Sequence, residues 1–205
     1  PHCWEFKLSL RNTGAEPITI SRADSLVCRI TGDDWHGLAF TSKWGGEWEP
    51  EPFTLPATRE LGVRAGRSSM GRSPWLGLSH AARGALVIAP VWSGNWHITL
   101  ESAGDGTLIK AGISPWKFAH VLQPGAVFEA PSVLLAIGED LEAASVALSR
   151  AVRAKIPRLS ARTDLPVEWN HWWPYEDRQI DEATFLANAE IATQLGIEVS
   201  TLDAG

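Results

Sequence analysis

The sequence predicts a mostly β protein that ends in a mixed α/β segment: a β-sandwich over residues 1–138, a helix and linker over 139–164, and a strand–helix–strand unit over 165–205. Two observations lead to this prediction. Apolar and polar residues alternate through the first two thirds of the chain, which is the two-residue period of half-buried strands. Near Glu139 the apolar period becomes helical, and a strand–helix–strand pattern follows.

The predicted sandwich begins with a strand at the N-terminus. Trp4, Phe6, Leu8 and Leu10 alternate with polar or charged residues, so we expect these four side chains on the buried face. Further apolar runs are separated by clusters of Gly, Pro, Asn and Asp, which is typical of an antiparallel sandwich. Other residues that we expect in the same core are Val87, Trp96, Ile98 and Leu100.

An amphipathic helix is predicted over residues 139–156. Residues from Leu141 to Val152 recur at spacings that place them on one helical face. Acidic residues occupy the first turn and basic residues the last, as the helix dipole favours. Pro157 is expected to stop the helix and to begin a linker.

The C-terminal segment predicts a parallel pair of strands joined by a helix. Residues 165–170 and 197–202 are apolar enough for short strands. Between them, Asp181 is a suitable N-cap for a helix that runs to about Leu195, and Gly196 is placed to end it. A strand, a helix and a second strand in this order form a βαβ unit, which implies a parallel sheet.

Candidate site residues follow the two strands of this unit, because parallel α/β folds place their sites at the C-terminal strand ends. Asn170, His171, Trp172 and Trp173 follow the first strand, and Asp203 follows the second. A carboxylate accepts hydrogen bonds from two sugar hydroxyls, and an indole covers the flat face of a sugar ring. We weigh sugar binding above capping of the sheet for Asp203 and Trp172, and equally with it for the other three.

Composition excludes several classes of protein. The net charge is −6 and the pI about 5.5, so we expect no nucleic-acid partner. No apolar run is long enough for a membrane helix, and the histidines lack metal-ligand spacing, so we expect neither a membrane partner nor a metal or other cofactor. Cys3 and Cys28 are expected to be reduced, which favours the cytoplasm. The chain begins at Pro1 rather than Met, so the compartment stays open.

The abundance of tryptophan favours a carbohydrate protein. The chain has 11 Trp against 1 Tyr and 6 Phe. An ordered set of short motifs then resembles glycoside hydrolase family 36, the α-galactosidases or melibiases, and covers nearly the whole chain. The motifs are Gly45-Gly46-Glu47-Trp48-Glu49-Pro50-Glu51, Gly66-Arg67-Ser68-Ser69, Pro74-Trp75, Trp92-Ser93-Gly94-Asn95-Trp96, Gly112-Ile113-Ser114-Pro115-Trp116, Pro124-Gly125, Phe128-Glu129-Ala130-Pro131, Trp169-Asn170-His171-Trp172, Leu195-Gly196-Ile197-Glu198 and Leu202-Asp203-Ala204-Gly205.

The resemblance implies a fold and an activity. The fold would be an N-terminal sandwich of the β-supersandwich type, then the opening strands of a truncated (β/α)8 catalytic barrel over residues 165–205. The activity of the intact parent would be retaining hydrolysis of terminal α-linked galactose, with substrate contacts from Asn170, Trp172, Trp173 and Asp203. Both catalytic carboxylates of the family lie on later barrel strands, so we expect them beyond Gly205 and expect this chain alone to be inactive. A homo-oligomeric parent is also expected.

Two departures from the family pattern keep the exact sugar open. Met70 stands where the family often has His, and Ala204 stands where it often has a second Asp that contacts galactose. One alternative is therefore a family member that acts on another α-linked sugar, such as N-acetylgalactosamine. A second alternative is a non-catalytic carbohydrate-binding sandwich, and a third is a structural or oligomerising domain. The βαβ tail argues against a simple binding module, which has no need of parallel strands.

Overall fold

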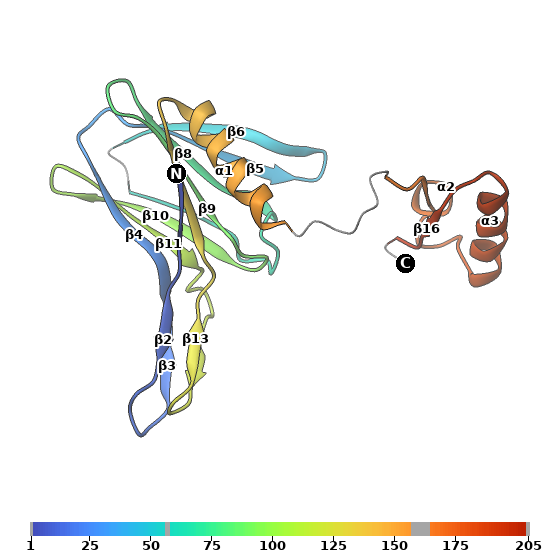
Figure 1. The fold of residues 1–205 in the computed structure, drawn as a ribbon, viewed down its shortest axis with the longest axis horizontal. Coiled ribbons are helices and arrows are strands. Elements are labelled where there is room, and N and C mark those ends of the chain that lie inside the picture. The colour runs from blue at the N-terminus through green and yellow to red at the C-terminus, as the bar shows by residue number, and fades with distance from the viewer. Residues whose placement is uncertain (1, 56–57, 157–164, 204–205) are drawn as a thin grey trace. The chain divides into compact units, whose positions relative to one another are not determined.

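The structure is a computed structural model that describes residues 2–55, 58–156 and 165–203. The chain divides into two compact units, Pro1–Ile156 and Pro157–Gly205, which we call the sandwich unit and the C-terminal unit (Figure 1). Each is described by itself. Pro157 and the rest of the expected linker up to residue 164, like Ala204 and Gly205, lie outside the described residues.

Two antiparallel sheets form the body of the sandwich unit. In the described residues the larger sheet has six strands, in the order β1-β14-β9-β8-β5-β6, and the smaller has four, in the order β4-β11-β10-β7. The larger sheet comprises β1 (Cys3–Phe6), β14 (Val133–Gly138), β9 (Gly84–Pro90), β8 (Gly71–His80), β5 (His36–Lys43) and β6 (Gly46–Thr54). The smaller comprises β4 (Ala23–Thr31), β11 (Gly106–Ile113), β10 (Trp96–Ala103) and β7 (Arg59–Gly62).

Short ribbons extend the sandwich unit beyond its two sheets. β2 (Ser9–Arg11) pairs with β13 (Val127–Glu129), and β3 (Ile18–Ile20) pairs with β12 (His120–Leu122). Figure 1 shows β2, β3 and β13 running out past the ends of the sheet strands. A separate apolar cluster holds these ribbons together and includes Ile20, Leu122, Leu8 and Leu10.

The main core lies between the two sheets. Ile98, Leu100 and Ile109 from the smaller sheet pack in one buried cluster with Leu76 and Ile88 from the larger. Alternate residues of each strand enter this cluster, as a half-buried strand requires. The predicted β-sandwich is therefore present, and its last strand ends at Gly138.

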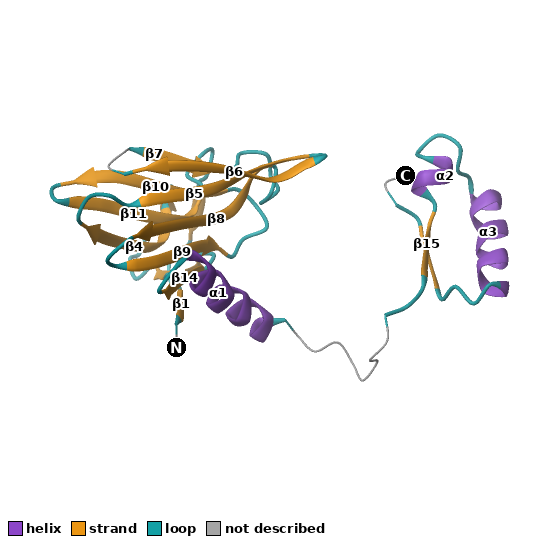
Figure 2. Cartoon of the chain, turned by 90° about the horizontal axis from the view of Figure 1, so that it is seen from above, coloured by secondary structure: helices purple, strands orange, loops and turns teal. Residues whose placement is uncertain are grey.

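Helix α1 (Leu141–Lys155) covers the outer face of the larger sheet (Figure 2). Its Ala144 and Leu148 pack with Val87, Leu134 and other residues of that face in a second buried cluster. The side chain of Asp140 caps the helix by accepting a hydrogen bond from the backbone N–H of Ala143 at 2.8 Å. The helix predicted over residues 139–156 is thus present, about two residues shorter at its N-terminus.

The prediction that Trp4 and Phe6 belong to the buried core was wrong. Trp4 is 43% exposed and Phe6 37% exposed. Their cross-strand partners Leu135 and Val133 belong to the main core, so the two aromatics do face the inner side of the larger sheet. They stay exposed because β1 is an edge strand of the larger sheet, where cover from the smaller sheet runs out.

The C-terminal unit contains the predicted parallel pair. β15 (Glu168–Asn170) pairs in parallel with β16 (Val199–Thr201), and α3 (Glu182–Gln194) connects them, alongside β15 in Figure 2. Asp181 caps α3 by accepting a hydrogen bond from the backbone N–H of Thr184 at 2.7 Å. Gly196, with a φ of +79°, takes the left-handed conformation that follows the end of the helix. The sequence did not predict the short helix α2 (Trp172–Tyr175).

Candidate functional site

The C-terminal ends of β15 and β16 meet, and they bring the predicted site residues together. Asn170 pairs with Thr201 at the end of the parallel register, and Asp203 follows two residues later. The Asn170 Nδ2 atom donates to Asp203 Oδ2 at 2.9 Å. The Asn170 Oδ1 atom accepts the backbone N–H of Trp172 at 2.8 Å. One amide side chain therefore connects the carboxylate to the start of the tryptophan helix α2.

His171 joins the same network from inside the protein. Its side chain is fully buried, and its Nδ1 atom accepts the backbone N–H of Asp203 at 3.0 Å. Its own backbone N–H donates to the carbonyl oxygen of Thr201 at 3.3 Å. From the sequence alone, we weighed sugar binding and a structural role equally for this residue. Burial and these bonds show a residue that holds the two strand ends together.

The two indoles of α2 differ in their surroundings. Trp172 is half-buried, and its ring lies edge-on to the ring of His171, with the centroids 6.4 Å apart and the planes at 85°. Trp173 is 81% exposed. Trp172 thus lies within the network of Asn170, His171 and Asp203, whereas Trp173 presents its indole to solvent. Whether either indole contacts a sugar stays a prediction.

An apolar cavity of about 360 Å³ opens at the start of α3. Ile180, Phe185 and Leu202 line it, together with the acidic residues Asp177 and Asp181. Hydrogen bonds from the backbone and side chain of Thr184 lower the pKa of Asp181, as expected for an ionised N-cap at the positive end of a helix. Asp181 therefore has a structural role.

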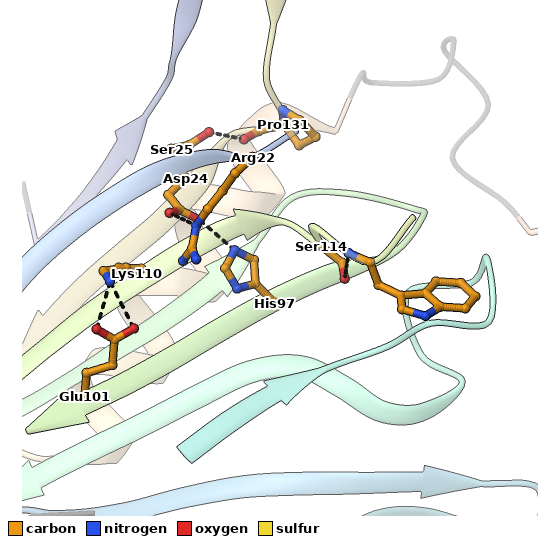
Figure 3. Close-up of polar contacts among 9 residues, drawn as sticks. Arg22, Asp24, Ser25, His97, Glu101, Lys110, Ser114 and Pro131 are labelled. Atoms are coloured by element: carbon orange, nitrogen blue, oxygen red, sulfur yellow. Dashed lines mark hydrogen bonds and ion pairs between the residues drawn. The ribbon is translucent and has the colours of Figure 1, made fainter. Parts of the chain in front are cut away.

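A second polar cluster lies on the sandwich unit, and sequence reasoning missed it (Figure 3). The His97 Nε2 atom is 2.6 Å from Asp24 Oδ1, and the Arg22 Nε atom donates to Asp24 Oδ2 at 2.7 Å. Burial alone would raise the pKa of Asp24, but the hydrogen bonds from His97 and Arg22 outweigh it and hold the pKa below its usual value. The cluster is a hydrogen-bonded pair of His97 and Asp24 on the smaller sheet, in which the His97 side chain is buried.

The His97–Asp24 pair lies beside an irregularity in the pairing of β4 with β11. The pairing of β4 with β11 skips one residue at Ser25, so that Leu26 and Asp24 face adjacent residues of β11. This is a β-bulge. The hydroxyl of Ser25 donates to the carbonyl oxygen of Pro131 at 2.6 Å, and the bond to His97 fixes the neighbouring Asp24 (Figure 3). The strand pattern around His97 predicts an outward-facing residue, so no sequence signal indicated its buried partner.

The structure also bears on metals, membranes and thiols. Among residues 2–55, 58–156 and 165–203, no three His, Cys, Asp or Glu side chains are grouped so that they could hold a metal ion. No helix in the described part of the chain is long and apolar enough to cross a membrane. Cys3 and Cys28 are both free thiols, and burial raises the pKa of each.

Comparison with known protein families matches most of the sandwich unit. The family model described as the glycosyl hydrolase family 36 N-terminal domain matches residues 5–123, which is more than half of the chain. Among curated proteins, the chain is 28% identical over 204 residues to alpha-galactosidase AgaA of Geobacillus stearothermophilus and 26% identical over 203 residues to alpha-galactosidase 1 of Pediococcus pentosaceus. Each alignment covers 95% of this chain but only 28% of the relative.

Solved structures support the fold across both units. The galactosidase domain of alpha-galactosidase-sucrose kinase, AgaSK, superposes with a TM-score of 0.85 at 24% identity and covers 100% of this chain and 30% of that one. The alpha-galactosidase from Lactobacillus brevis gives a TM-score of 0.78 at 24% identity, covering 96% of this chain and 28% of that one. At these identities the likeness concerns the fold alone.

Proposed function

The chain belongs to glycoside hydrolase family 36, and from this premise we propose that it is the N-terminal part of a retaining α-galactosidase-like hydrolase. The sandwich unit would be its N-terminal domain, and the C-terminal unit would be the opening of its catalytic barrel. The intact parent would remove terminal α-linked galactose. The chain spans 28% of the length of the curated relatives, so it would carry part of the sugar pocket and not the whole active site.

The observation that carries this proposal is the orientation of Asp203. Its carboxylate lies at the C-terminal ends of parallel strands, where α/β barrels bind substrate, and Asn170 fixes it through a 2.9 Å hydrogen bond. A carboxylate can accept about four hydrogen bonds, so the bond from Asn170 is compatible with two more from sugar hydroxyls. Trp172 enters the same network through its backbone, which suits an indole that covers the ring face.

The mechanism of retaining hydrolysis suggests which carboxylates bind the substrate and which carry out catalysis. That reaction needs two carboxyl groups about 5–5.5 Å apart, one to attack the sugar and one to donate a proton to the leaving group. The side-chain amide of Asn170 donates to the Asp203 carboxylate, and such a bond orients a carboxylate for further hydrogen bonding. Asp203 is therefore proposed to bind substrate. The nucleophile and the acid/base would come from barrel strands beyond Gly205.

The test compares the 205-residue chain with the full-length protein that contains it. We expect the full-length protein to release nitrophenol from nitrophenyl α-galactoside and the short chain to give no turnover. The nitrophenyl glycoside of α-N-acetylgalactosamine tests the alternative sugar. Hydrolysis by a clean preparation of the short chain would contradict the location proposed for the catalytic pair. Failure of the full-length protein on α-galactosides would refute the substrate.

A second candidate function is carbohydrate binding by the sandwich unit itself. Two indoles on the hairpin of β5 and β6 favour it, since Trp44 is 91% exposed and Trp48 59% exposed. Trp48 also has a φ of +62°, which is rare for a bulky residue, and its ring lies 5.3 Å from that of Phe40. Calorimetric titration of the chain with oligosaccharides tests this function, with Trp44→Ala as the matched variant. Equal binding by both proteins would refute a role for this hairpin.

A further inference from the structure

The contacts of His171 assign a role to this residue that goes beyond the proposed sugar contacts. Its imidazole is fully buried, whereas Asn170 is partly exposed and Asp203 exposed. Its Nδ1 atom accepts the backbone N–H of Asp203, and its backbone N–H reaches the carbonyl oxygen of Thr201. His171 therefore spans from the end of one parallel strand to the residues that follow the other.

Two separate hydrogen bonds set the position of the Asp203 carboxylate. The Asn170 amide holds the side-chain oxygen at 2.9 Å, and the His171 imidazole holds the backbone nitrogen at 3.0 Å. The bond to the imidazole acts on the backbone of Asp203, which lies beyond the last paired residue of β16, Thr201, whereas the bond from Asn170 acts on the side chain. A carboxylate that binds hydroxyls must be held close to its productive geometry, since small displacements weaken hydrogen bonds.

The protonation of the imidazole follows from the same bond. An Nδ1 atom that accepts an N–H must be unprotonated, so the proton of the neutral ring is on Nε2. Among the described residues, the buried Nε2 atom has no hydrogen-bond partner. The bond to the backbone of Asp203 is thus the interaction in this part of the chain that selects the tautomer.

We propose that His171 is a positioning residue for Asp203: as a neutral imidazole with its proton on Nε2, it fixes the backbone of Asp203 so that the carboxylate meets the sugar. His171 does not contact the substrate, because its side chain is fully buried. This role rests on the proposed function for its catalytic consequence, and the experiment below separates the two.

The first arm of the test uses two substitutions that are nearly equal in shape. In the full-length protein, His171→Asn keeps an acceptor oxygen close to the place of Nδ1, and His171→Leu removes it. We expect His171→Leu to lower kcat/KM on nitrophenyl α-galactoside about tenfold, the effect of one lost hydrogen bond at a buried acceptor, and His171→Asn to restore most of the activity. In an Asp203→Ala background, His171→Leu should cause no further loss, because His171 acts through Asp203.

The second arm does not depend on catalysis. Hydrogen exchange of the Asp203 amide, followed by mass spectrometry of peptides that contain it, reports the bond to Nδ1 directly. The amide should exchange about tenfold faster in His171→Leu than in His171→Asn. If His171→Leu fails to fold, His171→Gln takes its place, because its amide oxygen lies at the ε position and should not protect the Asp203 amide.

The outcomes separate the two claims. If the full-length protein hydrolyses no α-galactoside but the exchange pattern holds, the proposed function fails and the positioning role stands. If Asp203→Ala impairs an active enzyme but the Asn and Leu variants behave alike in kinetics and exchange, the function stands and the positioning role is refuted. An equal loss from His171→Leu with and without Asp203 would also refute it, since that pattern indicates a purely structural effect.

Discussion

The sandwich unit and the C-terminal unit bury their apolar side chains to very different extents. Trp96, Ile98 and Leu100 lie between the two sheets of the sandwich with no exposed surface. In the described part of the C-terminal unit, the buried residues are Ala192 and His171 alone. The sandwich therefore contains an apolar core of its own. The strands and helix of the C-terminal unit bury few side chains among themselves.

Sheet type explains this difference. In an antiparallel sandwich each sheet covers the inner face of the other, and here α1 also covers part of the outer face of the larger sheet. Parallel strands are normally covered on both faces, and in the described residues β15 and β16 form a sheet of two strands, with three residues in each. Leu186 and Ile191 on α3 stay exposed. The stability of the C-terminal unit should thus depend on apolar surfaces from outside residues 165–203.

Hydrogen exchange across the chain should break or confirm this comparison most clearly. We expect amides of β9, β10 and β14 to exchange only through global unfolding, and amides in residues 165–203 to exchange about a thousandfold faster or more, because local opening there exposes little apolar surface. Exchange of the 205-residue chain, resolved by peptide mass spectrometry, measures the contrast. Comparable protection on both sides of the linker would contradict it.

Removal of one tryptophan from each unit should affect stability to very different extents. Trp96→Ala should lower the free energy of unfolding of the sandwich by about 3–5 kcal/mol, since it leaves a cavity among fully buried side chains. Trp173→Ala should change the free energy of unfolding of the C-terminal unit by less than about 0.5 kcal/mol, because that indole is largely exposed. Urea unfolding followed by circular dichroism measures both. A large effect of Trp173→Ala would mean that α2 is packed against a core.

In the full-length protein, a substitution in the C-terminal unit should reduce activity more than one in the sandwich unit. Asp203→Ala should lower kcat/KM about tenfold or more, since each charge-assisted bond to a sugar hydroxyl is worth about 1.5–3 kcal/mol. Asp33→Ala, which removes an exposed carboxylate of the sandwich, is the matched control and should leave the kinetics unchanged. Steady-state kinetics on nitrophenyl α-galactoside test the pair. Unchanged kinetics for Asp203→Ala would show that Asp203 is not in the pocket.

The smallest expected effect concerns the contact between α1 and the edge strand β1. The Lys155 Nζ atom donates to Glu5 Oε2 at 2.6 Å, and this bond, with one from Ser132, lowers the pKa of Glu5 to about 2. A lowered carboxyl pKa stabilises the fold above the ordinary value of 4.5, and this contribution is lost as the pH falls from there toward 2.

Lys155→Met should therefore destabilise the sandwich by about 0–1 kcal/mol at pH 7, the range for an ion pair near the surface. The difference from the unaltered chain should shrink as the pH falls below 4.5 and vanish below about pH 2, once Glu5 is protonated in both proteins. Thermal unfolding at a series of pH values checks this. A difference that persists at low pH would show that the lysine stem, and not its charge, makes the contact.

Local patterns in the sequence predicted several of the elements, but they did not single out β5, β6, β7, β8 or β11. The two-residue alternation, the helical spacing after Glu139 and the caps at Asp181 and Gly196 correspond to strands, helices and helix ends in the structure. These features depend on neighbours within a few residues, so they can be read from the chain. The short helix α2 was missed because four residues with a proline leave no helical period to detect.

The convergence of Asn170, Trp172 and Asp203 was also predictable, because parallel strands joined by a right-handed crossover must bring their C-terminal ends together. The sequence did not predict which of these residues share hydrogen bonds. The roles of His171 behind Asp203, and of His97 beside Asp24, depend on burial among residues that are distant in the chain.

The amino-acid sequence alone indicates the β character of the first two thirds, the change to a helical period near Glu139 and the strand ends at which polar groups collect. Which faces are covered depends on the tertiary fold. Trp4 and Phe6 alternate like core residues but lie on an edge strand, whereas His97 alternates like a surface residue but is buried against Asp24. Alternation specifies on which side of a strand a residue lies, and burial depends on what another part of the chain places against that side.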